Sequence, residues 1–228
     1  VFLEPFMEIE KYYPVIRKFR DADVHQHLYT NGLLATEESL KALGEAGLDE
    51  IRFNLAASNC SDKVIGNIAI AKKYIKSVGI ESPMFPEFFS AFLKKKQAIL
   101  DTKPDFINCA ELHLSENNIG NYYGENMYIL RHGYISPVWS RELTLKLMKI
   151  ADDEKWDLVV HDCSNYTKFA RGLNWGSKAG MAFGTSNYGC EFSRFPYEFF
   201  IPVLTDDNFQ FLSEEELPDH YKPEVISL

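Results

Sequence analysis

The 228-residue sequence lacks three features: a cysteine cluster, a long apolar run and an excess of basic residues. Its four cysteines are too few and too scattered for a disulfide framework, which predicts reduced thiols and a cytoplasmic protein. No apolar run reaches the ~18 residues that suggest a membrane span, so no membrane partner is expected. The net charge is −9, from 24 basic and 33 acidic residues. Since nucleic-acid binding needs a basic surface, no nucleic-acid partner is expected either.

The sequence starts at Val1 rather than at a methionine. We therefore expect a fragment of a longer chain, and the missing signal peptide says nothing about location. The alternating pattern described below weakens after residue 171, and residues 206–228 are strongly acidic. This predicts one large domain over residues 1–171 and an irregular extension with an acidic tail over residues 172–228.

Short β-prone runs alternate with amphipathic helical runs along the first domain. A helix is expected from its N-cap Thr36 to Gly47, and another from Ser61 or Asp62 through Ile75 to Gly79. A third helix should pass through Phe89 and Leu100, and a fourth should be capped by Ser140. The expected strands are 24–30, 50–55, 80–85, 106–114 and 158–161, with a long loop over 115–136. The alternation predicts the α/β class, with a parallel sheet arranged as a barrel or as an open sheet.

Polar residues follow several of these strands. In parallel α/β folds ligands bind at the carboxyl ends of the strands, so these residues are the candidates for a binding site. Gly32 should adopt a positive φ there and allow close backbone approach to a ligand. The residues at the expected rim are Glu4, Thr30, Asn31, Gly32, Asn54, Glu87, Glu111 to His113 and His161 to Cys163.

Two stretches resemble the middle of a radical S-adenosylmethionine (SAM) domain. The first is Leu28-Tyr29-Thr30-Asn31-Gly32, and the second is Gly47-Leu48-Asp49-Glu50-Ile51-Arg52-Phe53-Asn54-Leu55. Upstream, Glu4-Pro5 matches the end of that family's Gly-Gly-Glu-Pro segment, although Phe2 and Leu3 replace both glycines. The nearest branch is similar to pyruvate formate-lyase-activating proteins.

This resemblance implies a partial (β/α) TIM-like barrel with parallel strands, incomplete at its N-terminus. It also implies a [4Fe–4S] cluster that cleaves SAM to a 5′-deoxyadenosyl radical, which abstracts hydrogen from a substrate. Glu4 would lie beside the SAM amino group, where a carboxylate attracts an ammonium. Thr30 and Asn31 would contact the ribose or the methionine moiety, and Asn54 would contact the same ligand.

The cysteines depart from the family pattern. The family holds its cluster with Cys-x3-Cys-x2-Cys, because three thiolates must lie close together on one cubane. Cys60, Cys109, Cys163 and Cys190 are far apart in the sequence. The family motif precedes the Glu-Pro segment, so we expect the cluster ligands upstream of Val1.

The residues after the later strands are candidates for the substrate side of the site. Glu111 and His113 are two residues apart and share one face of an expected strand. Asp162 and Lys168 lie in a polar segment after a clean apolar strand. The sequence leaves the substrate open, as a small molecule, a peptide or a protein.

Two alternatives remain open. His25-x-His27 could bind zinc in a metal-dependent barrel hydrolase, with His113, His161 and Asp162 completing the site. Against this, both histidines should lie near the start of their strand, away from the ligand-binding end. A non-catalytic α/β module is the third hypothesis, docking through the aromatic residues Phe192, Phe195, Tyr197, Phe199 and Phe200. As part of a larger barrel, the first strand should leave an unpaired edge with exposed apolar surface.

Overall fold

A computed structural model describes residues 4–114, 118–122, 124–129, 135–165, 201–205 and 208–212. The chain divides into two compact units. The first comprises residues 1–110 and 143–162, and the second comprises residues 111–142 and 163–228. The division expected at residue 171 stays a prediction.

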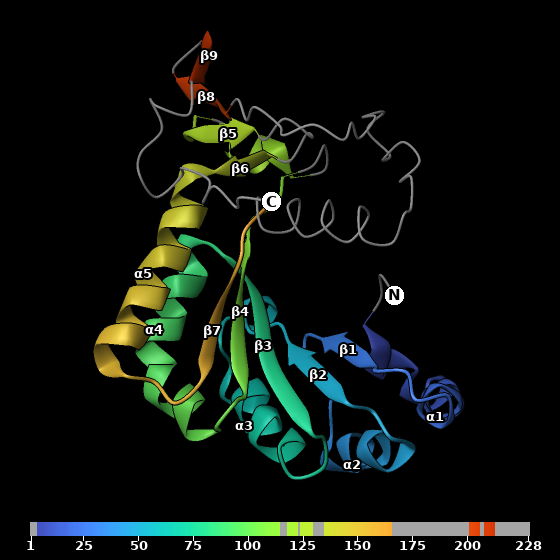
Figure 1. Cartoon of the computed structure of the whole chain (residues 1–228). Coiled ribbons are helices and arrows are strands. Elements are labelled where there is room, and N and C mark those ends of the chain that lie inside the picture. Colours follow the sequence, from blue (N-terminus) through green and yellow to red (C-terminus); the bar gives the residue numbers. More distant parts are fainter. Residues whose placement is uncertain are drawn as a thin grey trace, which may run out of the picture. The chain divides into compact units, whose positions relative to one another are not determined.

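The first unit is built on a five-stranded parallel sheet, which confirms the α/β class and suits a partial (β/α) barrel (Figure 1). The strand order is β1-β2-β3-β4-β7. Parallel pairing places the carboxyl ends of neighbouring strands at the same edge of the sheet, where the sequence predicts a ligand. The strands are β1 (His27–Thr30), β2 (Glu50–Phe53), β3 (Ser77–Met84), β4 (Phe106–Glu111) and β7 (Val159–Cys163).

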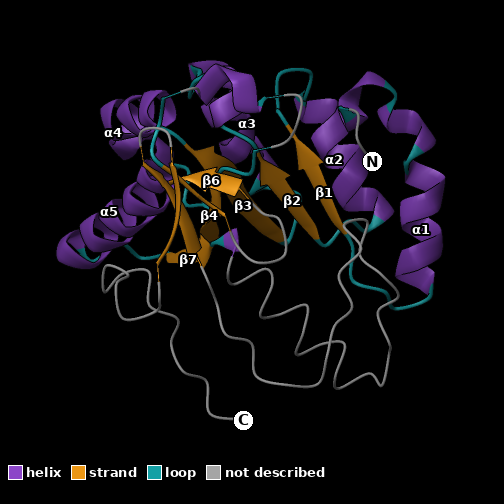
Figure 2. Ribbon diagram, turned by 90° about the horizontal axis from the view of Figure 1, so that it is seen from above, coloured by secondary structure: helices purple, strands orange, loops and turns teal. Residues whose placement is uncertain are grey.

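Helices α2, α3 and α4 lie on one side of this sheet (Figure 2). Residues of β2 and β3 that point to this side, such as Ile51, Phe53 and Ile80, are fully buried. Their neighbours on the other side are polar, for example Glu50 and Arg52, because side chains alternate along a strand. The helices are α1 (Tyr13–Asp21), α2 (Glu37–Ala46), α3 (Asp62–Ala71), α4 (Pro86–Asp101) and α5 (Val138–Glu154), with 3-10 turns η1 (Pro5–Met7), η2 (Ile9–Lys11), η3 (Ala56–Ser58) and η4 (Ile119–Tyr122).

Helix α2 begins and ends where the sequence predicts. The Thr36 hydroxyl accepts a hydrogen bond from the Ser39 backbone N–H at 3.2 Å, and the Ser39 hydroxyl accepts one from the Thr36 N–H at 3.0 Å. This reciprocal capping box satisfies backbone groups of the first turn. At the other end Gly47 has φ +97°, the left-handed conformation that ends many helices.

Helix α3 is shorter than predicted. It ends at Ala71, and the expected terminator Gly79 lies inside β3 instead. A Cβ on Gly79 would lie 2.1 Å from the Phe106 ring of β4, so this glycine allows a close side-chain approach within the sheet. The residues after Ala71 form a turn that packs closely on α2, where a Cβ on Gly44 would lie 2.2 Å from the Tyr74 carbonyl oxygen.

Ser140 is not the cap of the next helix, because α5 begins two residues earlier at Val138. Its hydroxyl instead accepts a hydrogen bond from the Leu112 backbone N–H at 2.9 Å. The sequence places a polar residue correctly near the helix start, but tertiary contact rather than capping uses its oxygen.

The second unit contains a four-stranded sheet of order β6-β5-β8-β9, in which the neighbouring strands pair antiparallel. Strands β5 (Met127–Ile129) and β6 (Ile135–Pro137) occupy part of the stretch that the sequence assigns to a long loop. Strands β8 (Ile201–Thr205) and β9 (Asn208–Leu212) lie within residues 172–228. The aromatic residues 192–200 lie outside the described residues.

Strand β1 is at one edge of the five-stranded sheet, as predicted. In the part of the chain that the structure describes, β2 is its hydrogen-bonded neighbour, in register from His27 opposite Glu50 to Thr30 opposite Phe53. Large hydrophobic side chains are exposed on and after this strand, including Tyr29 at 48% and Leu34 at 52%. Among the described helices, none combines the length and the apolar character that crossing a membrane requires.

Candidate functional site

Three of the four predicted SAM-binding residues meet through hydrogen bonds at the carboxyl end of β1. Thr30 is the last residue of the strand and is 4% exposed. Its hydroxyl donates to Glu4 Oε1 at 2.6 Å and accepts from the Gly32 backbone N–H at 2.8 Å. Glu4 Oε2 accepts from the Asn31 backbone N–H at 2.7 Å. Residues 26 positions apart in the sequence thus form one polar corner.

The Glu4 carboxylate has a defined orientation because it also caps η1. The carboxylate accepts a third hydrogen bond, at Oε1 from the Phe6 backbone N–H at 3.2 Å. A carboxylate offers about four acceptor positions, so these described contacts leave about one. The carboxylate can therefore hold the strand end in place and still accept a hydrogen bond from a cationic ligand group.

Gly32 has the positive φ that the sequence predicts, at +71°. A Cβ here would lie 2.8 Å from both Phe53 and Val64, so the turn also requires glycine for space. Asn67 of α3 donates to the carbonyl oxygens of Gly32 and Ala35 at 3.0 and 3.1 Å. The loop after β1 is therefore fixed by helix α3 of the following βα unit.

Asn54 joins the same corner from β2. Its backbone N–H donates to the Thr30 carbonyl oxygen at 2.8 Å. Its side-chain oxygen accepts from the Ala57 N–H at 3.2 Å, which fixes the amide as a local cap. The NH2 group is then the part of this half-buried side chain that suits a ligand acceptor.

The predicted substrate-side residues are only partly brought together. Glu111 is 2% exposed, and its Oε2 accepts from the Asn165 backbone N–H at 2.6 Å. Asn165 is fully buried and was not singled out from the sequence, although it lies in the polar segment noted after β7. His113 and Asp162 are half-buried, and they belong to different units. Lys168 lies outside the described residues.

The hydrolase ligand set does not converge. His161 is on β7, where its Nδ1 lies 2.6 Å from the side-chain oxygen of Asn108. His27 is on β1, at the opposite edge of the five-stranded sheet. With ~4.8 Å between neighbouring strands, four steps across the sheet are far more than one metal ion can bridge. His27 is the first residue of β1, so the predicted position of the histidine pair near the strand start is confirmed.

Arg52 organises the polar side of the sheet, and sequence reasoning missed it. Its guanidinium donates to Glu50 at 2.5 Å, to Glu81 at 2.8 Å and to the Tyr29 hydroxyl at 3.0 Å. The guanidinium carbon also lies 5.3 Å from the ring centres of Tyr29 and Phe106. Burial opposes the charge, but the hydrogen bonds to Glu81 and Glu50 outweigh it and raise the pKa of Arg52 above its usual value.

The described cysteines do not fit a [4Fe–4S] cluster. Cys60 and Cys109 are buried and Cys163 is half-buried. Burial raises the pKa of the Cys60 thiol to about 11, which disfavours the thiolate that a cluster needs. Across the described residues, the group of three or more potential metal ligands that the structure brings together contains no cysteine. Cys190 lies outside the described residues.

The chain is similar to two proteins of Methanocaldococcus jannaschii. One, named "putative glycyl-radical enzyme activating enzyme", is 33% identical over 167 residues, which are 70% of this chain and 43% of that protein. The other, named "uncharacterized protein", is 30% identical over 96 residues, which are 37% of this chain and 33% of that protein. No family model and no solved structure matches the chain. The matched part of this chain therefore spans less than half the length of either relative.

Proposed function

We propose that this chain is part of a radical SAM enzyme of the glycyl-radical-activating kind, and that it holds SAM at the carboxyl ends of β1 and β2. The similarity to the archaeal activating-enzyme relative supports the family. The observation that carries the proposal is the Glu4 carboxylate, fixed between the Thr30 hydroxyl and the Asn31 N–H at the strand end.

The proposed role of each residue follows from its contacts. Glu4 would accept from the SAM ammonium group through its remaining acceptor position. Thr30 would hold Glu4 in place and contribute no direct contact, because its buried hydroxyl already donates to Glu4 and accepts from Gly32. The side chains of Asn31 and Asn54 would hydrogen-bond the ribose or the methionine carboxylate.

The iron–sulfur cluster would depend on thiolates outside the described residues, because the described cysteines do not form a site. The part of the reaction that this chain would perform is to bind and orient SAM and to exclude water around it. By analogy with the name of the relative, its substrate would be a glycyl-radical enzyme. Glu111, His113, Asp162 and Lys168 stay the residues predicted for the substrate side.

The test is SAM binding followed by NMR on the 228-residue chain, with Glu4→Gln and Glu8→Gln as matched variants. Glu8 is an exposed carboxylate on the same segment, paired with Lys11. SAM should shift the amide signals of Asn31, Gly32 and Asn54, and Glu4→Gln should weaken binding by ~10-fold or more, the usual value of a charged hydrogen bond. Glu8→Gln should bind like the parent. Equal weakening by both variants, or shifts confined to other residues, would contradict the proposal.

A further inference from the structure

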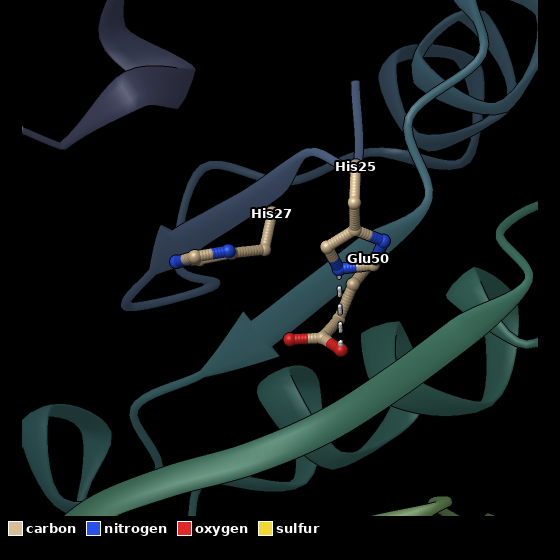
Figure 3. A group of neighbouring side chains, drawn as sticks. All are labelled: His25, His27 and Glu50. Carbon is tan, nitrogen blue, oxygen red and sulfur yellow. Dashed lines mark ion pairs between the residues drawn. The ribbon is translucent and has the colours of Figure 1, made fainter. Parts of the chain in front are cut away.

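A second cluster of potential ligands lies at the amino end of the same two strands. His27 and Glu50 are directly opposite each other in the parallel pairing of β1 with β2. His25 lies two residues before the strand, and its ring centre is 6.4 Å from that of His27. One ligand atom from each of the three residues lies within 4.8 Å of the others, and Figure 3 shows the three side chains side by side.

The His25 ring is oriented between two carboxylates. Its Nε2 lies 4.0 Å from Glu50 Oε2, and its Nδ1 lies 3.9 Å from Asp49 Oδ2. Asp49 is itself fixed, because it accepts from the Gln26 backbone N–H at 2.9 Å. Metal-binding histidines commonly turn one nitrogen to the ion and the other to a carboxylate. Carboxylates flank His25 on both sides in a similar way, with Nε2 on the side of Glu50 and with Asp49 Oδ2 beyond hydrogen-bond distance of Nδ1.

The charges around the cluster favour a cation. Glu50 Oε1 accepts from Arg52. Oε2 faces His25 and, among the described residues, accepts a long hydrogen bond from the Ser77 hydroxyl at 3.4 Å. Arg52 also pairs with Glu81, so two carboxylates share its charge. With neutral imidazoles, Asp49 and Glu50 against one arginine leave a charge of 1 − 2 = −1 beside the histidines.

We propose that His25 Nε2, one ring nitrogen of His27 and Glu50 Oε2 bind a zinc ion, with water as the fourth ligand. Imidazole and carboxylate ligands suit Zn²⁺, whereas Mg²⁺ and Ca²⁺ prefer oxygen ligands alone. Zinc bonds of ~2.0–2.2 Å require ligand atoms ~3.3 Å apart, so atoms that lie within 4.8 Å of one another must close by up to about 1.5 Å. His25 is 63% exposed and His27 is exposed, so both rings can turn without disturbing the core.

The site is distinct from the proposed SAM site, since it lies at the other end of β1 and uses none of the same residues. A zinc ion there would join the edge strand to β2 and stabilise the folded chain by mass action. Loss of zinc binding would therefore leave SAM binding unchanged, and loss of SAM binding would leave zinc binding unchanged.

The test is zinc titration of the metal-free chain by calorimetry, with His25→Ala, His27→Ala and the control His161→Ala. We expect one zinc per chain, at least ~10-fold weaker binding in each of the first two variants, and parent-like binding in the control. Zinc tenfold above its dissociation constant should raise the unfolding midpoint by about 3–6 °C, and magnesium should not. Cobalt in place of zinc should give a visible spectrum without sulfur charge-transfer absorption, which distinguishes this site from cysteine ligation.

Three results would overturn the proposal: no zinc binding, parent-like zinc binding in His27→Ala, or a cobalt spectrum typical of thiolate ligation. The second result would mean that zinc binds elsewhere on the chain. If an alanine variant fails to fold by circular dichroism, Asp49→Asn gives the same test while keeping all three ligands. It should bind zinc ~10-fold more weakly, as expected for a carboxylate behind a ligating histidine, and parent-like binding there would also count against the site.

Discussion

The two ends of strand β1 are built in opposite ways. At the carboxyl end Thr30 is 4% exposed, and the hydrogen bonds of its hydroxyl with Glu4 and Gly32 are 2.6 and 2.8 Å long. At the amino end the side chain of His25 is 63% exposed, and its nearest carboxylate oxygens are 3.9 and 4.0 Å away. A ligand at the first end meets fixed groups, whereas a ligand at the second must draw the groups together. Binding groups are therefore preorganised at the carboxyl end of β1 and not at its amino end.

The largest expected effect is loss of the Arg52 guanidinium, which pairs with both Glu50 and Glu81. Arg52→Met leaves the largely buried Glu50 and Glu81 without their shared partner, and should lower the free energy of unfolding by about 2–3 kcal/mol. Urea denaturation measures the change. Arg17→Met, on the exposed side of α1, is the control and should stay within about 0.5 kcal/mol of the parent. Equal stability of the two variants would show that the network does not support the sheet.

Thr30→Val tests the carboxyl end. Valine keeps the shape of the side chain but removes both hydrogen bonds of the hydroxyl, so the free energy of unfolding should fall by about 1–3 kcal/mol. Thr30→Ser keeps the hydroxyl and should lose less in the same urea titration. If valine were as well tolerated as serine, the hydrogen bonds of Thr30 with Glu4 and Gly32 would not stabilise the carboxyl end of β1.

Cys60, which follows β2, tests how well the chain is buried beyond the carboxyl ends of β1 and β2. Burial raises the pKa of its thiol from 9.0 to about 11, a change that the positive charge of Lys95 only partly offsets. Iodoacetamide should therefore modify Cys60 ~100-fold more slowly at pH 8 in the folded than in the unfolded chain, as read by peptide mass spectrometry. Because the folded pKa is the higher one, this thiol's contribution to stability is complete below pH 9 and is lost as the pH rises through 11. Equally fast modification in both states would refute this burial.

The smallest expected change in stability is at the amino end of β1. In metal-free buffer with a chelator, His27→Ala should change the free energy of unfolding by no more than about 0.5 kcal/mol, since the side chain is exposed. The same urea titration measures it. A loss above 1 kcal/mol without metal would show that His27 supports the fold directly, and the contrast between the two ends would disappear.

The sequence predicts the bounds of a helix correctly where capping residues lie directly at its two ends. Thr36 and Gly47 predict α2 to the residue because capping and the left-handed turn involve only neighbouring residues. The sequence does not predict where α3 ends and β3 begins, because the apolar residues there fit either a helix or a strand. Pairing with β2 decides that stretch, and Gly79 is needed for Phe106 rather than for a helix end.

The candidate sites also contain contacts that the sequence does not predict, because those contacts depend on tertiary structure. The resemblance predicts Glu4, Thr30 and Asn31 together, but not that Glu4 is largely occupied by hydrogen bonds from within the chain. The His25-His27 pair is visible in the sequence, whereas its partner Glu50 is not. Only the strand register places Glu50 opposite His27, and register depends on how whole strands pair.

Asn67 has a consequence for movement in this part of the molecule. Its single amide ties the backbone that follows β1 to a helix that belongs to the following βα unit. Any shift of α3 is therefore transmitted directly to the turn at Gly32, and the two βα units should travel together as one body. A molecule that binds at the carboxyl end of β1 would then contact the Gly32 turn and α3 as one rigid surface, and not a loop that moves separately.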